Sequence, residues 1–223
     1  MSKQFTASFS KLRNFETCPH KHQQVDLLKR YTETSEQLVW GNRVHEAFEN
    51  AFKHNRPLPE DMKPWEKWVK IAKRLPGEHL IEEKWALTRD LQPTEYFGPR
   101  VWWRGRGDFV ALQETTAAIL DWKTGGMKHD SDQLVLCALC LFAYHSSLQR
   151  IRCTFVWLPD DCPSSDTYTR EDVANALKNG LLDRINALEH AAINNIYPKR
   201  PSGLCVRHCP VDCCNFYKVG TPR

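Results

Sequence analysis

Acidic and basic side chains spaced for metal-assisted hydrolysis lie on two neighbouring strand-like segments. Asp108 lies at the start of the first segment, just after Gly105 and Gly107, and Asp121 and Lys123 end the second, whose preceding residues are apolar. Side chains two residues apart on a strand share a face, so we expect Asp121 and Lys123 on one face and Trp122 on the other. A hairpin that turns through residues 113–116 would bring Asp108 beside Asp121.

Two carboxylates beside an amine suit one kind of chemistry. Neighbouring carboxylates repel each other, and a hard divalent cation such as Mg²⁺ or Mn²⁺ relieves the repulsion because it prefers oxygen ligands. The Lys123 ammonium could then orient or polarise a water molecule for in-line attack on a phosphodiester. The pattern therefore predicts a metal-dependent phosphodiester hydrolase, unless Asp121 and Lys123 form an ordinary surface ion pair.

Two other places in the chain carry similar spacing. Asp-x-Lys recurs at Asp61, where a proline-rich turn enters a helix and the two side chains should diverge. Residues 82–84 are Glu-Glu-Lys and could also lie on a strand. We favour Asp121 because it ends an apolar strand whose expected partner carries Asp108.

Hydrophobic periodicity predicts the elements that position these residues. Apolar residues at helical spacing indicate helices, and alternating or β-branched runs indicate strands. The expected helices span 36–52, 62–73 and 132–145, and a long fourth helix starts at Thr169, whose hydroxyl suits an N-cap. The expected strands are 80–87, 101–112, 117–123 and 151–158. This order predicts an α/β or α+β fold, with a small mixed central sheet flanked by helices.

Four motifs, in family order, resemble those of the PD-(D/E)xK nuclease superfamily in its RecB-like branch. They are Gly41-x-x-Val44-His45, Gly105-Arg106-Gly107-Asp108-Phe109, Leu120-Asp121-Trp122-Lys123-Thr124-Gly125, and Gln133. The last motif continues to a tyrosine in the family, whereas this chain has Cys137, so the DNA contact of that tyrosine does not carry over. The resemblance implies an α/β fold with a restriction-endonuclease-like core.

The resemblance also implies a role for each matched residue. The metal ligands would be His45, Asp108, Asp121 and the backbone carbonyl of Trp122. The catalytic residues would be Lys123, Asp121, Asp108 and Gln133, with Glu82 or Glu83 as an auxiliary acid. From residue type alone, His45 could instead be an ordinary surface or core histidine, and Gln133 could cap its helix.

The nine cysteines are an odd number, and four of them crowd between residues 205 and 214. In a reducing compartment such crowding indicates metal or iron–sulfur ligation before disulfides. The start of the chain has no apolar run, and the most apolar stretch, Leu134 to Tyr144, is about half of what a membrane-spanning helix needs. We therefore expect a cytoplasmic protein with no membrane segment, in the bacterial host cytoplasm if it is phage-encoded.

Some RecB-like nucleases, such as the AddB-type helicase-nucleases and the nucleases of CRISPR adaptation, hold a [4Fe–4S] cluster with one N-terminal and three C-terminal cysteines. The similarity, which extends to phage-type sequences, implies Cys18, Cys205, Cys209 and Cys214 as ligands, with Cys213 as the alternative to Cys214. Zinc fits the same thiolates, and His208 could replace one of them. We expect one nuclease domain over residues 1–223, in which residues 1–35 and 198–223 form a cysteine-clasped N/C-terminal region.

The resemblance implies an exonuclease that acts on DNA ends in recombination or repair. Its partners would be single-stranded or duplex DNA ends and a recombination protein. The net charge of +4 permits a nucleic-acid partner without demanding one. Trp102 or Trp103 could stack on an unpaired base, although tryptophan more often packs in the core. The rival hypotheses are a catalytically inactive DNA-binding or assembly subunit with a structural zinc or iron–sulfur site, and a zinc-ribbon DNA-binding protein.

Overall fold

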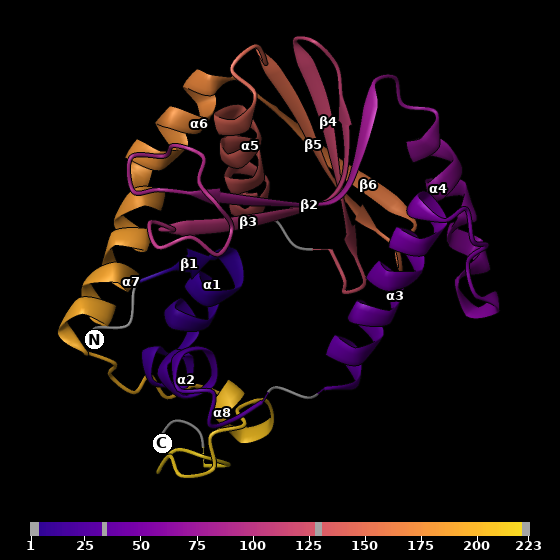
Figure 1. The fold of residues 1–223 in the computed structure, drawn as a ribbon. Coiled ribbons are helices and arrows are strands. Elements are labelled where there is room, and N and C mark those ends of the chain that lie inside the picture. Colours follow the sequence, from indigo (N-terminus) through magenta and orange to yellow (C-terminus); the bar gives the residue numbers. More distant parts are fainter. Residues whose placement is uncertain (1–4, 33–34, 128–130, 220–223) are drawn as a thin grey trace. The chain divides into compact units, whose positions relative to one another are not determined.

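The computed structural model describes residues 5–32, 35–127 and 131–219, and it divides the chain into two compact units. The first unit combines both ends of the chain, Met1–Thr34 and Leu182–Arg223, and the second is the continuous segment Ser35–Leu181. Figure 1 shows the elements of each unit along the chain. Each unit is described by itself below.

The second unit is built on a mixed sheet. Its strands are β2 (Glu78–Leu87), β3 (Trp103–Leu112), β4 (Thr116–Lys123), β5 (Arg150–Trp157) and β6 (Cys162–Tyr168). The pairs β2–β3, β3–β4 and β5–β6 are antiparallel, and β4–β5 is parallel. A parallel pair needs a crossover, which here contains the helix α5 (Asp132–Tyr144). The predicted mixed sheet with flanking helices is confirmed.

Helices flank this sheet because their apolar residues must be buried. The helices α3 (Glu36–Lys53) and α4 (Glu66–Lys73), with a 3₁₀ turn at Glu60–Trp65, pack on a core cluster that includes Phe109 and Trp122. The helix α5 is apolar on nearly every side and is buried from Leu134 to Phe142. In Figure 1, α3 and α5 lie on different sides of β4 and β5. The strands therefore bury both faces.

Three elements differ from the sequence-based expectation. The strand β6 was not predicted, because its residues are polar and mostly exposed, which removes the apolar signal. The predicted helix at 62–73 begins as a 3₁₀ turn that contains Pro64. The predicted long helix from Thr169 has the expected N-cap, but α6 (Arg170–Ala176) and α7 (Leu182–Asn194) are separate, because Gly180 between them has a φ of 112°.

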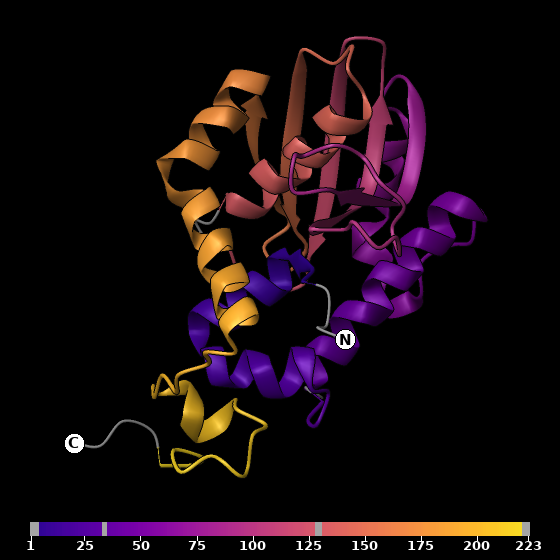
Figure 2. The same cartoon turned by 60° about the vertical axis from the view of Figure 1, so that its left-hand side comes forward.

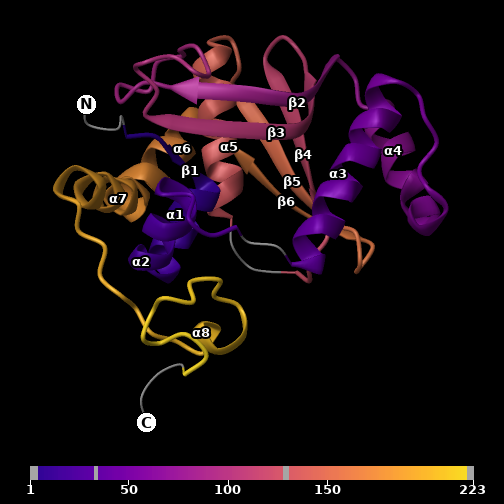
Figure 3. The same ribbon diagram turned by 60° about the horizontal axis from the view of Figure 1, so that its bottom comes forward.

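The first unit is made of short elements. They are β1 (Ala7–Ser8), α1 (Phe9–Thr17), α2 (Pro19–His22), a π-helical turn at Gln23–Leu27, α7, and α8 (Leu204–Arg207). The Arg184 guanidinium on α7 bonds to the Glu16 carboxylate on α1 at 2.5 Å, and His22 bonds to Asp26 at 2.8 Å. Figures 2 and 3 show that the yellow C-terminal segment runs mostly as loops around α8. Within the described residues, no helix is both long and apolar enough to cross a bilayer.

Candidate active site

The antiparallel pairing of β3 and β4 brings their acidic residues together. Phe109 lies opposite Leu120 in the register, so Asp108 and Asp121 are the next facing positions. The backbone N–H of Trp122 donates to Oδ2 of Asp108 at 2.9 Å. The hairpin expected from the sequence is therefore confirmed, except that Asp108 lies in the middle of β3 and not at its start.

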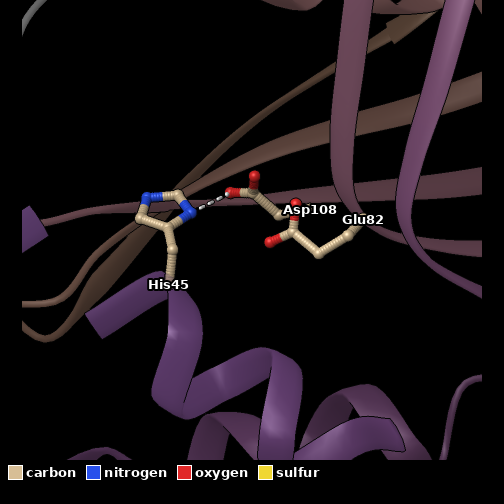
Figure 4. A group of neighbouring side chains, drawn as sticks. All are labelled: His45, Glu82 and Asp108. Carbon is tan, nitrogen blue, oxygen red and sulfur yellow. Dashed lines mark ion pairs between the residues drawn. The ribbon is translucent and has the colours of Figure 1, made fainter. Parts of the chain in front are cut away.

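The ligand atoms of His45, Glu82 and Asp108 all lie within 4.8 Å of one another. Figure 4 shows the imidazole of His45, on α3, directed toward the carboxylates of Asp108 and Glu82. Nδ1 of His45 lies 3.3 Å from Oδ2 of Asp108. Glu82 and Asp108 are each 8 % exposed, so two buried carboxylates face one another beside a single imidazole. These three residues form the acidic group.

An unusual backbone conformation accompanies Glu82 in the acidic group. Glu82 has a φ of 56° within β2, the left-handed region that residues other than glycine rarely adopt. Such a conformation costs about 1–3 kcal/mol and persists only when the surrounding structure compensates. Glu83, its rival in the sequence, is half-buried and lies outside the acidic group. Of the two glutamates that sequence reasoning left as alternatives, Glu82 is therefore the one that lies beside His45 and Asp108.

Asp121 is held in a second set of contacts. Its Oδ1 lies 2.6 Å from the Lys123 ammonium, and its Oδ2 accepts a 2.6 Å hydrogen bond from the Gln133 amide. Lys123 in turn donates to Oε1 of Gln133 at 2.8 Å. The three side chains thus form a closed triangle between the end of β4 and the first turn of α5. Asp121 is 5 % exposed but is not one of the three residues within the 4.8 Å group.

Burial and the repulsion between carboxylates raise the pKa values of two carboxyl groups of the site, Asp121 and Glu82. Burial, together with Asp108, raises the pKa of Asp121 to about 6, although Lys123 and His45 oppose the shift. Burial and Asp108 likewise raise the pKa of Glu82, against the effect of Arg106. Burial lowers the pKa of His45, but Asp108 outweighs it and the pKa rises. Asp108 thus contributes to the raised pKa of both Asp121 and Glu82, and a cation would relieve this repulsion.

Residues beside the acidic side chains fix the packing of the strands. The Trp122 ring faces the other side of β4, 4.7 Å from Phe48 and stacked 5.9 Å from Phe52, as the strand alternation predicted. Gly41 of α3 lies against Thr124, since a Cβ at Gly41 would be 3.3 Å from Oγ1 of that threonine. The helix α3 thus approaches the end of β4 closely at this glycine.

The glycines of the Gly-Arg-Gly-Asp segment make room for a buried tryptophan. A Cβ on Gly107 would lie 2.4 Å from Cη2 of Trp85, and one on Gly105 would lie 2.8 Å from Sγ of Cys140. Cys137, which stands at the family's tyrosine position, is buried, and its thiol donates to the carbonyl of Arg106 at 3.6 Å. Packing, and not flexibility, therefore explains these two glycines.

Three other residues or residue pairs can be compared with the sequence-based expectations: the tryptophans at 102 and 103, Asp61, and Arg106. Trp102 and Trp103 are 5 % and 1 % exposed, so the suggestion that one of them stacks on a base is wrong. Asp61, in the second Asp-x-Lys segment, is exposed and pairs with Arg43, as expected for diverging side chains. Sequence reasoning missed Arg106, whose guanidinium contacts the Glu82 carboxylate. Its position two residues before Asp108 was the available signal.

The predicted cysteine ligands lie in the first unit. The backbone N–H of Arg200 donates to Sγ of Cys18, and that of Ser202 to Sγ of Cys205, both at 3.4 Å. Burial raises the pKa of Cys209, and the Cys205 and Cys18 thiols raise it further, against the effects of Val211 and Lys21. Among the described residues, no three of these sulfurs form a group of ligand atoms within 4.8 Å of one another. Of the two C-terminal alternatives, Cys213 is exposed and Cys214 is half-buried.

A family model described as the PD-(D/E)XK nuclease superfamily matches residues 6–215. A solved structure of a candidate exonuclease from Eubacterium rectale is similar at 16 % identity and a TM-score of 0.54, with 100 % of this chain and 91 % of that chain covered. The crystal structure of SSO0001 matches at 13 % identity and a TM-score of 0.49, over 97 % of this chain and 89 % of that one. No curated protein matches the sequence at a significant level.

Proposed function

Because the chain belongs to the PD-(D/E)XK nuclease superfamily, we propose that it is a divalent-metal-dependent deoxyribonuclease that shortens DNA from its ends. The observation that carries the proposal is the convergence of two buried carboxylates and an imidazole within 4.8 Å, beside an aspartate bonded to a lysine. A surface ion pair would be solvated, whereas the carboxylates of Glu82, Asp108 and Asp121 lie on three separate strands and are each at most 8 % exposed.

The donor set fits a hard divalent cation. His45, Asp108, Asp121 and the backbone carbonyl of Trp122 would hold Mg²⁺ or Mn²⁺, with Glu82 as a further oxygen ligand. Carboxylate oxygens predominate in this set, and such oxygens are what these two cations prefer. When bound, the cation lowers the pKa of a water molecule and offsets the negative charge that develops on a phosphodiester.

The side chains of the triangle position the reacting groups. Lys123 is fixed by Asp121 and Gln133, so its ammonium can donate to an attacking water molecule or to a phosphate oxygen without reorganising. Trp122 contributes through its backbone, since its N–H orients the Asp108 carboxylate. Gln133 acts as a positioning residue because it touches both charged partners.

The test is a DNA degradation assay with matched variants. Purified protein is incubated with end-labelled linear DNA, single-stranded or duplex, and Mg²⁺, Mn²⁺ or EDTA. Asp121→Ala and Lys123→Ala should abolish metal-dependent loss of DNA, whereas Lys63→Ala, in the exposed Asp-x-Lys segment, should leave it intact. DNA binding without any metal-dependent cleavage would refute the proposal and favour an inactive DNA-binding or assembly subunit.

Circular DNA separates end-dependent digestion from internal cleavage. An exonuclease should degrade linear single strands and leave covalently closed circles of the same sequence intact. The similarity to a candidate exonuclease, and the resemblance to RecB-like enzymes, support this finer proposal and a role in recombination or repair. Equal loss of circles and linear strands would exclude the exonuclease and leave the nuclease.

We further propose that Cys18, Cys205, Cys209 and Cys214 hold a [4Fe–4S] cluster. Two backbone N–H groups already donate to Sγ atoms of this set, and hydrogen bonds to cluster sulfurs are usual around iron–sulfur centres. The C-terminal segment is mostly loop, with α8 only four residues long, so a cluster would supply order that packing does not.

The surroundings of each cysteine support Cys214 over Cys213 as the fourth ligand. Cys213 is exposed and contacts Tyr31, which also donates to Asp212 at 2.7 Å, whereas Cys214 is half-buried. Cys214→Ser should therefore lose bound metal, and Cys213→Ser should retain it. Visible absorbance with iron and sulfide would identify the cluster, and colourless protein that contains zinc would replace it with a structural zinc site.

A further inference from the structure

Basic and aromatic side chains gather on β2, β3 and the loop that joins these strands. The Arg104 guanidinium lies 5.0 Å from the Tyr96 ring and 5.2 Å from the Phe97 ring, and its Nε donates to the Tyr96 carbonyl at 2.8 Å. The Lys84 ammonium lies 6.0 Å from the Tyr96 ring. Two cations thus lie against two adjoining rings at one place on this unit.

Phe97 is 82 % exposed, the highest exposure of any large hydrophobic side chain in the described residues. It is nevertheless held in an anchored loop. The Tyr144 hydroxyl bonds to Ala86 and to the Thr94 carbonyl at 3.2 Å or less, and the Thr94 N–H donates to Ala86 at 3.0 Å. The Phe97 ring also meets the Tyr96 ring edge to face at 5.0 Å. An exposed aromatic ring that its loop holds in place offers a surface on which a ligand can stack.

The basic residues form a line that begins at the acidic group. Lys84 lies directly opposite Arg106 in the β2–β3 register, and Arg106 contacts the Glu82 carboxylate. Gly105 and Gly107, which alternate with these arginines along β3, face Trp85. Arg104 and Arg106 therefore point to the other face of the strand. Alternate residues on a strand are about 7 Å apart, so Arg106 and Arg104 are successive steps away from Asp108.

We propose that Lys84, Arg104 and Arg106, with Tyr96 and Phe97, form a track that binds single-stranded DNA and leads its end to the acidic group. The cations would contact successive phosphates, and an unpaired base would stack on Phe97. This combination of positive charge and an aromatic face is how proteins bind single strands without sequence preference. A duplex keeps its bases stacked inside and offers none to Phe97. The proposal rests on the proposed nuclease function only for the direction of the strand.

The test measures binding apart from cleavage. Fluorescence anisotropy in EDTA follows a labelled oligothymidylate of about 12 nucleotides, a length within the usual range of single-strand sites. Phe97→Ala should weaken binding roughly 5- to 100-fold, the effect of losing one stacked base. Phe97→Trp should restore it, and Ile71→Ala, which removes another exposed apolar side chain in the same unit, should have no effect.

The charge of the track is tested by its salt dependence. Arg104→Gln should lower the slope of log affinity against log salt concentration by about 0.7, the value for one single-strand phosphate contact. Arg152→Gln, an exposed arginine on β5, is the matched control and should leave the slope unchanged. Circular dichroism melts check that each variant folds. If Arg104→Gln does not fold, the binding of Phe97→Ala tests the proposal by itself.

The outcomes separate this proposal from the nuclease function. Parent-like binding by Phe97→Ala and Arg104→Gln, or tighter binding of a hairpin duplex than of the single strand, would overturn the track even if the parent cleaves DNA. Weaker binding by both variants, with a parent that never cleaves DNA, would support the track and refute the nuclease. Weaker binding together with slower digestion of linear single strands would support both.

Discussion

Adding one methyl group at Gly107 should destabilise the second unit. The new Cβ would lie 2.4 Å from Cη2 and 3.0 Å from Cζ3 of Trp85, whereas carbon atoms normally meet at about 3.5–4.0 Å. Trp85 is fully buried, so its rigid ring cannot move aside. Inserting such a group into a packed core costs about 1–3 kcal/mol, and we expect Gly107→Ala near the upper end.

Thermal and urea unfolding, followed by circular dichroism, measure this effect. A loss of about 3 kcal/mol should lower Tm by about 6–12 °C in a protein of this size. Gly126→Ala is the matched control, because a Cβ there meets no atom within 4 Å, and it should change stability by less than about 0.5 kcal/mol. Since Asp108 is the next residue after Gly107, Gly107→Ala should also lower DNA cleavage, and Gly126→Ala should not.

A compensating change tests the cause of the destabilisation. Trp85→Phe removes the atoms that the new methyl group would meet, although it leaves a cavity of its own. The two changes together should therefore cost less than their sum, with a coupling of about 0.5–3 kcal/mol. Additive losses, or a Gly107→Ala variant as stable as the parent, would refute the packing explanation for this glycine.

Three further predictions concern single side chains. Gln133→Leu removes hydrogen bonds to two charged groups, each worth about 1.5–3 kcal/mol, so kcat should fall about 10- to 100-fold with little change in the KM for DNA; a large rise in KM alone would contradict a positioning role. Glu82→Gln should raise the Mn²⁺ concentration needed for half-maximal activity about 10- to 100-fold, and Glu83→Gln should not, as metal titrations would show. Asp26 is affected first by burial, which raises its pKa, but its bonds to His22 and Asn14 outweigh burial and the pKa is lowered. Its stabilising contribution is thus present above its unfolded pKa of about 3.9 and is lost as the pH falls through the lower folded value. Asp26→Asn should therefore cost about 1–3 kcal/mol in urea unfolding at neutral pH and little in strong acid, and an equal loss at both would count against the ion pair.

Periodicity was enough to predict the elements that carry the site. The strand pair that holds Asp108 and Asp121 has apolar residues at regular spacing, and the direction of Trp122 follows from strand alternation. The strand β6 had no such signal, because it lies at the edge of the sheet beside the buried strand β5 and its own side chains are polar and mostly exposed. The break at Gly180 was hidden by an apolar stripe that continues on both sides of it.

The side chains that complete the site follow from tertiary contacts that the sequence pattern does not contain. Glu82 and Glu83 are chemically identical, and only the left-handed backbone at Glu82 and its place within 4.8 Å of Asp108 distinguish them. Phe97 lies in a turn-rich segment whose composition predicts only a loop. Its exposure depends on the anchoring of that loop by Tyr144, which is 47 residues further along the chain.

Each carboxylate of the site has its own basic partner. Asp108 faces His45, Asp121 contacts Lys123, and Glu82 contacts Arg106.

These partners differ in their access to solvent. The Arg106 side chain is 54 % exposed, whereas those of His45 and Lys123 are 34 % and 24 % exposed. Arg106 is therefore the partner that can exchange a carboxylate for a DNA phosphate at the smallest cost, because water already solvates much of its surface. That exchange would free an oxygen of Glu82 for a cation as the strand arrives, because Arg106 is the track residue that contacts the acidic group.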